Sequence, residues 1–323
     1  MEISNSICDV PGIRVGHAQN ETARTGCTVI IPKNGAVAGV DVRGSAPGTR
    51  EVAAIEPTRH VKTIHAVLLT GGSAFGLAAA DGVMRYLEEN AVGYDTGAAR
   101  VPIVPAAVIY DLAIGRADIR PDAAMGYQAC VNARENANEW GSIGAGTGAT
   151  VGKIAGPEYA MPGGIGQASL QLENGIVIGV LVVVNSLGDV ISPKTGEIIA
   201  GALSTDRKSF LNSAEYLKKA GGSPFNRTNT TLGVVATNAQ LNVEEATKLA
   251  QMAHDGLARA INPVHTPYDG DTIFALSTGN EPGNLLQLGS AAANLVSEAI
   301  LRAVQATAPT YLDRQNGFPK KPS

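Results

Sequence analysis

A polar loop runs directly into a β-branched strand within residues 226–238, and the junction holds side chains that could do chemistry: Asn229, Thr230 and Thr231. An amide followed by two hydroxyls suits a precursor that cuts itself before a Thr. The hydroxyl attacks the preceding carbonyl, and the freed α-amine then serves as the base that activates the hydroxyl. A plain loop entering a buried strand is the alternative, because Asn and Thr are common in turns and strands.

Two carboxylates, Asp269 and Asp271, flank Gly270 where a turn enters another strand. Residues at i and i+2 of an extended segment point to the same side, so both carboxylates can face one site. Solvated turn acids are the alternative, although residues 265–268 make this turn crowded. A buried carboxylate pair could hold an α-ammonium group or shift the pKa of a neighbour.

Other motifs lack the residues that their chemistry requires. The glycine cluster at 144–153 is not a phosphate-binding loop, because Thr147 stands where such a loop needs Gly and Ile154 where it needs a hydroxyl. Residues 71–75 lack the second glycine of a nucleophile elbow, and Ser73 is interpreted as a helix cap. The five histidines never pair with a carboxylate or cysteine at metal-ligand spacing, so we expect no metal site.

Length and composition exclude several classes of function. A chain of 323 residues, 44% of them hydrophobic, can bury a large core as one large domain or two smaller ones. The net charge of −4 gives no electrostatic basis for binding nucleic acid or an anionic membrane surface. We expect no signal peptide and no membrane span, and the three unevenly spaced cysteines are interpreted as reduced thiols of a cytoplasmic protein.

The hydrophobic pattern predicts a mixture of strands and helices. Residues 64–69 form a continuous apolar run of strand length, and Asn242 with Glu245 predicts the start of a helix that ends near Ala260. We expect other strands at 13–16, 27–31, 36–42, 230–238 and 272–276, a hairpin of 169–172 with 176–184, and helices at 75–89, 121–138 and 285–304. Residues 187–228 have the composition of an exposed, cleavable loop. Strands and helices do not alternate strictly, which favours an α+β fold.

Several dispersed blocks, in one order along nearly the whole chain, resemble a family of N-terminal-nucleophile hydrolases. The family includes L-aminopeptidase/D-esterase, β-peptidyl aminopeptidases and the 6-aminohexanoate-oligomer (nylon oligomer) endohydrolase, and the chain is most similar to the nylon-oligomer branch. The blocks are residues 41–44, 71–77, 107–111, 152–153, 229–231 and 265–272. Several blocks in one order are more specific than a single motif, so the resemblance favours self-cleavage over the plain loop.

The resemblance implies one autoprocessed domain, 1–323, that is cut between Asn229 and Thr230. The cut gives a larger chain, 1–229, and a smaller chain, 230–323, that stay together. Thr230 would be the nucleophile and would form an acyl ester that water hydrolyses. The other matching positions are Lys153, Asn185, Asp269 and Asp271 as catalytic residues and Tyr110 as a residue near the substrate.

The residue types at these positions fit the implied chemistry. A free α-amine has a pKa of about 7.7–8.0, which Lys153 would lower, so that the amine acts as a base near neutral pH. Asp269 and Asp271 would orient the amine and Thr230. Asn185, together with backbone N–H groups, would donate to the oxyanion. No metal or organic cofactor is required.

The family also implies a fold, an assembly and a substrate class. The implied fold is a four-layer αββα sandwich with two sheets flanked by helices, assembled as a homotetramer of processed units. The substrate would be a linear amide or short peptide. The nylon-oligomer branch is favoured because the aminopeptidases carry an acid where this chain has Val108 and a Ser where it has Asp269. The alternatives are an aminopeptidase or β-peptidyl aminopeptidase of the same family, an acyltransferase of the ornithine acetyltransferase type, and a non-catalytic binding protein.

Overall fold

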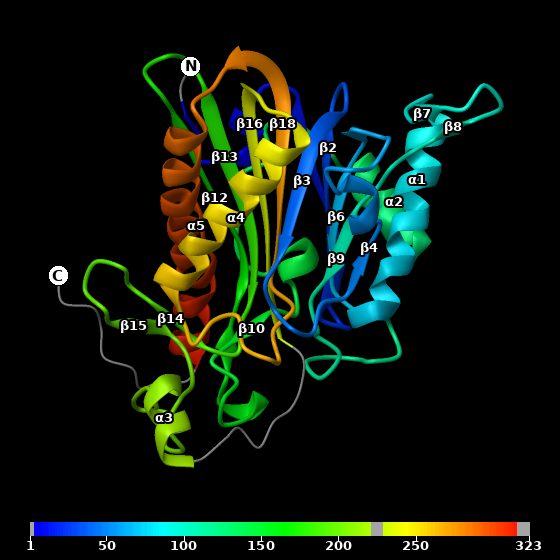
Figure 1. The fold of residues 1–323 in the computed structure, drawn as a ribbon. Coiled ribbons are helices and arrows are strands. Elements are labelled where there is room, and N and C mark those ends of the chain that lie inside the picture. The colour runs from blue at the N-terminus through cyan, green and yellow to red at the C-terminus, as the bar shows by residue number, and fades with distance from the viewer. Residues whose placement is uncertain (1–2, 221–228, 315–323) are drawn as a thin grey trace.

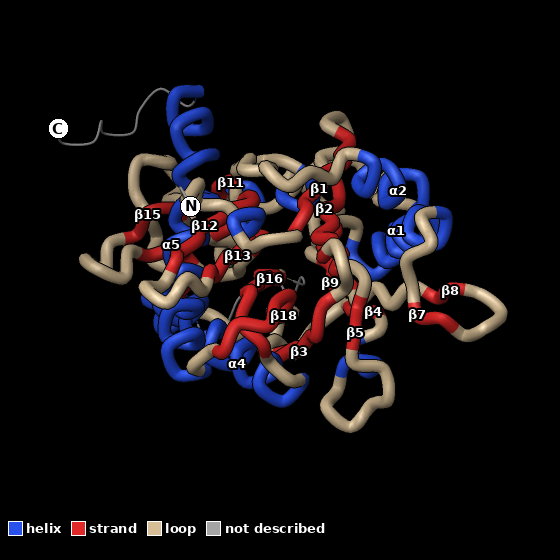
Figure 2. Tube along the Cα trace, turned by 90° about the horizontal axis from the view of Figure 1, so that it is seen from above, coloured by secondary structure: helices blue, strands red, loops and turns tan. Residues whose placement is uncertain are grey.

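Two β-sheets enclosed by helices make up the described part of the molecule, residues 3–220 and 229–314 of a computed structural model. Figure 1 shows four layers: helices α4 (Val243–Ala260) and α5 (Leu285–Arg314), a six-stranded sheet, a five-stranded sheet, and helices α1 (Ala79–Glu89) and α2 (Ala123–Val131). Figure 2 shows the same arrangement from above. The predicted α+β class and four-layer αββα sandwich are therefore confirmed.

The six-stranded sheet carries the strands on both sides of the predicted cleavage point. Its strands, in spatial order, are β12 (Gly164–Gln171), β13 (Val177–Asn185), β16 (Thr230–Gln240), β18 (Thr272–Pro282), β3 (Ala36–Val42) and β5 (Thr63–Ile64). β16 runs parallel to β18 and antiparallel to β13. The starts of β16 and β18 and the end of β13 therefore meet at one end of the sheet.

The five-stranded sheet sends another loop to the same end of the sandwich. Its strands, in spatial order, are β1 (Ile13–Asn20), β2 (Thr25–Pro32), β6 (Val67–Thr70), β9 (Ala106–Val108) and β4 (Thr49–Arg50). In Figure 1 the loop after β9 and the loop before β18 both lie at the lower end of the sandwich. Tyr110 is thereby brought from the second sheet toward the end of β13.

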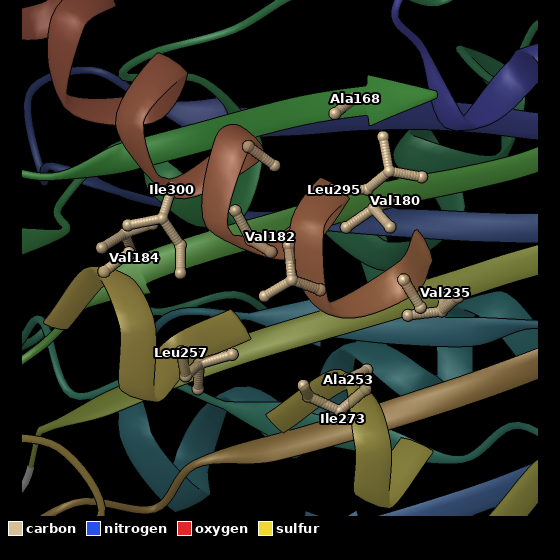
Figure 3. Close-up of a cluster of buried hydrophobic side chains, with 14 of the residues drawn as sticks. Ala168, Val180, Val182, Val184, Val235, Ala253, Leu257, Ile273, Leu295 and Ile300 are labelled. Atoms are coloured by element: carbon tan, nitrogen blue, oxygen red, sulfur yellow. The ribbon is translucent and has the colours of Figure 1, made fainter. Parts of the chain in front are cut away.

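Three hydrophobic clusters fill the three spaces between the four layers. β13 is buried on both faces, so that Val182 faces the helices and Val183 faces the other sheet. Figure 3 shows the cluster on the helix side, where Val182 lies with Leu257 of α4 and Leu295 of α5. Each such side chain contributes about 1.5–3 kcal/mol of hydrophobic free energy. This core fixes which way each residue of the strand points, up to the polar residue at its end.

Smaller elements lie outside the two main sheets. Figure 2 shows that the hairpin of β7 (Tyr94–Asp95) and β8 (Arg100–Val101) projects from the side of the five-stranded sheet. The others are β10 (Thr150–Val151) paired with β11 (Met161–Pro162), a sheet of β15 (Ile198–Ala200), β14 (Asp189–Ile191) and β17 (Ile261–Asn262), helix α3 (Ser213–Ala220), and 3₁₀-helices Ile7–Asp9, Val52–Ile55, Ser73–Ala78, Gly144–Gly146 and Pro157–Tyr159.

Several sequence predictions are confirmed closely. The side chain of Asn242 accepts a hydrogen bond from the Glu245 N–H at 2.8 Å, and the helix that it caps, α4, ends at Ala260 as predicted. The predicted hairpin is the antiparallel pair β12 and β13. The three cysteines are free thiols. Local signals were sufficient here because capping boxes and tight turns act within a few residues.

The single strand predicted at residues 64–69 is wrong. β5 ends at Ile64 and pairs with β3 in the six-stranded sheet, whereas β6 begins at Val67 and pairs with β2 and β9 in the five-stranded sheet. The chain crosses from one sheet to the other at His65, whose N–H donates to the Ile103 carbonyl at 2.9 Å. Apart from His65 the run is apolar, because the crossing itself is buried.

Three other predictions need correction. Ser73 caps no helix, because it lies at φ 54° inside a 3₁₀-helix and its N–H donates to the Ile109 carbonyl. The helix predicted at 121–138 ends at Val131, since the chain then pairs Arg134 with Val15. The loop predicted at 187–228 contains β14, β15 and α3 up to residue 220, and the rest of it lies outside the described residues.

Candidate active site

Thr230 and Asn185 face each other across the ends of two neighbouring strands. Thr230 is the first residue of β16, and its antiparallel partner is Asn185, the last residue of β13. Partners in an antiparallel pair point to the same face, with Cβ atoms about 4.5–5.5 Å apart. Leu232 and Val183, two positions further along each strand, lie in the core between the two sheets. The buried side chains of Thr230 and Asn185 therefore face the space between the sheets.

The peptide bond before Thr230 is held by contacts on both sides of Asn229. The Asn229 N–H donates to the Tyr268 carbonyl at 2.7 Å, and the Asn229 carbonyl accepts from the Gly270 N–H at 2.7 Å. The Thr230 hydroxyl lies 2.5 Å from the same carbonyl oxygen. The hydroxyl thus lies beside a carbonyl that already has an N–H donor, and such a donor stabilises the negative charge that develops during attack.

Lys153 lies against the strand partner of Thr230. Its Nζ donates to Asn185 Oδ1 at 2.8 Å and to the Asn185 carbonyl at 2.9 Å. The Thr150 N–H also donates to Asn185 Oδ1, at 3.0 Å, and Asn185 Nδ2 donates to the Tyr110 carbonyl at 3.2 Å. Three segments of the chain, around residues 110, 150–153 and 185, are joined through this one buried amide. Tyr110 takes part through its backbone carbonyl.

The charge state of Lys153 is set by its surroundings. Burial lowers the pKa of the Lys153 ammonium from 10.5 to about 7, and the nearby carboxylates of Asp269, Asp111 and Asp271 oppose that shift. A group with a pKa near the working pH can both accept and release a proton, which is the requirement for general acid–base chemistry. Lys153 meets this requirement at neutral pH.

Asp269 is fixed by its own turn and is hard to ionise. Its Oδ2 accepts from the N–H of Thr266 at 3.0 Å and from the Thr266 hydroxyl, and its Oδ1 accepts from the Leu187 N–H at 3.4 Å. Burial, and next the charge of Asp271, raises the pKa of Asp269 to about 6. Near neutral pH this carboxyl can therefore exchange a proton with its surroundings.

Asp271 connects the predicted nucleophile strand to a histidine. Its Oδ1 accepts from the Thr231 N–H at 2.6 Å, and its Oδ2 accepts from His265, both from the backbone N–H at 3.2 Å and from the ring Nδ1 at 2.7 Å. The His265 ring meets the ring of His254 on α4 edge to face, with centroids 4.9 Å apart. Asp271 therefore fixes the backbone next to Thr230 and is itself held by the turn.

The structure brings together every residue predicted for the site, and it adds groups that the sequence prediction did not include. The Gly270 and Thr150 N–H groups are backbone donors, which no residue letter identifies. His265 was noted only as part of a crowded turn. Asp111, buried between Thr25 and the Gly72 N–H, has a pKa raised by burial. It lies directly after Tyr110 in one of the family-like blocks, which is the signal that could have found it.

The surroundings of the site include a cleft and lack a metal-binding cluster. A cleft of about 770 Å³ opens beside Thr150 and is also lined by Arg24, Ile114 and Trp140. Within residues 3–220 and 229–314, no three His, Cys, Asp or Glu side chains gather as metal ligands would. In the same described part of the chain, no helix is both long and apolar enough to cross a membrane.

The chain has sequence relatives along nearly its whole length. The chain matches Peptidase family S58 over residues 5–316. It is 42% identical to an uncharacterized aminopeptidase of Mycobacterium tuberculosis, over 96% of this chain and 97% of the relative. It is 32% identical to the 6-aminohexanoate-oligomer endohydrolase of a Kocuria species, over 92% of this chain and 85% of the relative.

Two solved structures have the same fold. A β-aminopeptidase of a Burkholderia species superposes with a TM-score of 0.69 at 25% identity, covering 98% of this chain and 95% of that one. The L-aminopeptidase D-Ala-esterase/amidase of Ochrobactrum anthropi, described as a variant of the Ntn hydrolase fold, gives a TM-score of 0.72 at 23% identity, covering 94% and 86%. The family match and the relatives together show that this chain belongs to peptidase family S58 and is a hydrolase of amide or peptide bonds.

Proposed function

We propose that the protein is a self-cleaving amide hydrolase in which Thr230 is the nucleophile. The observation that carries the proposal is the Asn229 carbonyl, which lies 2.5 Å from the Thr230 hydroxyl and accepts the Gly270 N–H at 2.7 Å. An attacking oxygen and an oxyanion donor on one peptide bond are the two groups that an acyl shift from nitrogen to oxygen requires.

In the proposed self-cleavage the Thr230 hydroxyl turns from the Asn229 carbonyl oxygen, to which it donates, and gives its proton to neutral Lys153, which is held on the strand partner of Thr230. The Thr230 oxygen bonds to the Asn229 carbonyl carbon, and the Gly270 N–H stabilises the oxyanion. The carbon–nitrogen bond then breaks, an ester forms, and the proton passes to the leaving amine. Water hydrolyses the ester, which leaves a carboxylate on Asn229 and a free α-amine and hydroxyl on Thr230.

In turnover the α-amine of Thr230 is the base and its hydroxyl attacks the amide of the substrate. Asp271 holds the Thr231 N–H at 2.6 Å and thereby fixes the residue that carries the amine. Positive charge on Lys153 lowers the pKa of the amine, and Asp269 helps to orient it. Asn185 donates to the oxyanion through Nδ2, whose second hydrogen is available beside the one given to the Tyr110 carbonyl. Tyr110 borders the substrate.

The two chains are expected to stay together as one domain after the cut, and to assemble as a homotetramer in the cytoplasm. What supports the first expectation is the pairing of residues 178–185 of β13 with 230–237 of β16, which joins the two chains across the cut. Size-exclusion chromatography with light scattering, under native conditions, measures both the association of the chains and the number of units.

The test is intact mass spectrometry of the purified protein, with N-terminal sequencing of the smaller chain. We expect two chains, the smaller starting at Thr230, and a Thr230→Ala variant that stays whole. Thr231→Ala is the matched control, because it removes the neighbouring hydroxyl and keeps Thr230. A single intact chain from folded wild-type protein would overturn the proposal.

An aminopeptidase activity is the second candidate, because relatives named aminopeptidase are 42% identical to this chain. The two activities differ in what they require at the amino end of the substrate. Peptide amides with a free or an acetylated amino terminus distinguish them: an aminopeptidase requires the free amine, whereas the amide hydrolase accepts the acetylated form.

A further inference from the structure

The segment at residues 268–271 has two hydrogen-bonding edges, and both are in use. One edge faces residues 43–46: the Arg43 N–H donates to the Asp271 carbonyl at 3.0 Å and the Ala46 N–H donates to the Asp269 carbonyl at 2.9 Å. The other edge holds Asn229 through the Tyr268 carbonyl and the Gly270 N–H, and Asn229 pairs with Asp269 as a parallel β-bridge. Asn229 is thus bound as one residue of an added strand.

Two glycines leave room for the backbones on both edges of this segment. A Cβ added at Gly270 would lie 2.8 Å from the Thr230 hydroxyl and 2.7 Å from the Ala46 carbonyl oxygen. A Cβ at Gly44 would lie 2.1 Å from the Asp269 carbonyl oxygen. Both contacts are shorter than real Cβ contacts, so glycine at 44 and 270 is needed for the three backbones to lie side by side.

Self-cleavage and substrate turnover both form an ester on the Thr230 oxygen. In the proposed self-cleavage the acyl group that ends in Asn229 becomes an ester on the Thr230 oxygen, and in turnover the acyl group of the substrate becomes an ester on the same oxygen. After the cut, an acyl group that displaces Asn229 would meet the Tyr268 carbonyl as an acceptor and the Gly270 N–H as a donor beside the nucleophile. An acyl group that satisfies both pairs them again.

We propose that the acyl part of the substrate takes the place of Asn229 and is recognised through its own backbone groups. The N–H of the acyl part donates to the Tyr268 carbonyl, and the carbonyl of the acyl part accepts from the Gly270 N–H. This inference rests on the proposed self-cleavage at Thr230. Asn229 presents its N–H and its carbonyl on either side of one carbon, so the site selects α-aminoacyl amides. This selectivity departs from the longer amino acyl groups that the resemblance to the nylon-oligomer branch implies. A β-amino or longer amino acyl group moves the N–H away from the Tyr268 carbonyl when its carbonyl lies on Gly270.

The test uses wild-type protein that mass spectrometry has shown to be cut before Thr230, and three matched 4-nitroanilides. They are N-acetyl-L-asparagine anilide, its analogue with CH₂ in place of the acylated N–H, and its β-amino homologue with one extra methylene. We expect kcat/KM to fall about tenfold for each analogue, the effect of losing one hydrogen bond.

Different results would contradict the proposed self-cleavage and the proposed acyl site. A chain that is never cut before Thr230 defeats the proposed function itself. Three results with cut protein overturn the acyl-site inference and leave the self-cleavage intact. They are hydrolysis of the CH₂ analogue as fast as the parent, hydrolysis of the β-amino homologue faster than the parent, and hydrolysis of none of the three anilides.

Discussion

The backbone N–H and the ring Nδ1 of His265 both donate to one oxygen of Asp271, at 3.2 and 2.7 Å. His265 makes this double contact from a backbone with φ 53°, in the left-handed region. The other oxygen of Asp271 holds the Thr231 N–H. One histidine thus orients the carboxylate that fixes the backbone next to Thr230.

His265→Asn should slow the hydrolysis of amides by about tenfold to a hundredfold, because the variant loses a hydrogen bond to a charged group of about 1.5–3 kcal/mol. Asn tolerates the left-handed backbone and keeps the N–H donor, so the fold should be retained. The measurement is kcat and KM, and we expect the loss in kcat. His60→Ala is the control, because His60 is exposed and far from Asp271 in the chain. An unchanged kcat in His265→Asn would contradict this role.

The rate of self-cleavage should rise as the pH passes through about 7, where Lys153 loses its proton. Below that pH the ammonium cannot accept the Thr230 proton, and above it the amine can. The measurement is the fraction of cut chain against time in refolded precursor at pH 5.5 to 9. Lys153→Arg keeps the positive charge at every pH in this range and should leave the precursor whole throughout. A flat pH profile would show that another group is the base.

Asn185→Asp should shift this profile toward higher pH. The substitution places a carboxylate where Asn185 Oδ1 now accepts from the Lys153 ammonium at 2.8 Å. An opposite charge at that distance favours the protonated amine by about 1–3 pKa units. The variant should therefore cut more slowly at pH 7 and recover part of its rate at pH 9. Asn185→Ala is the comparison: it removes the amide without adding charge and should show no recovery.

The hydrophobic pattern allowed the α+β class to be predicted, and the resemblance to the family allowed the four layers and most side chains of the site to be predicted. The groups that were missed have physical reasons for it. Thr230 and Asp271 carry side chains whose types and spacing suggest a role, whereas Lys153 was predicted only through the resemblance to the family. The Gly270 N–H is a backbone group, and its contact with Asn229 depends on two loops that meet only in the fold. The crossing at His65 was also missed, because both sheets bury their strands and every other residue of the run is apolar.

The free energy of unfolding of an uncut variant should depend on pH through the partly buried Lys153 ammonium. Lys153 has a lowered pKa in the fold, about 7 against 10.5, so between these values the unfolded chain binds more protons than the folded one. Stability must then rise with pH across this window. For Thr230→Ala we expect a gain of about 1–2 kcal/mol from pH 7 to pH 9, by urea unfolding, after allowing for the partial exposure of Lys153. The same variant with Lys153→Met should lack that gain, and an equal gain in both would contradict the assignment.

Gly270→Ala tests whether self-cleavage depends on the close packing around Gly270, which lies beside the Thr230 hydroxyl, the Asn229 carbonyl and residues 43–46. The added methyl would meet the Thr230 hydroxyl at 2.8 Å and the Ala46 carbonyl at 2.7 Å, so the hydroxyl must move away from the Asn229 carbonyl. A displacement of this kind at the reacting atoms costs about a hundredfold in rate. We expect a folded precursor that cuts itself much more slowly than wild type, followed by mass spectrometry over hours. Circular dichroism and the unfolding midpoint confirm the fold. Cleavage at the wild-type rate would show that the hydroxyl reacts from another position and that the close contact at Gly270 does not control it.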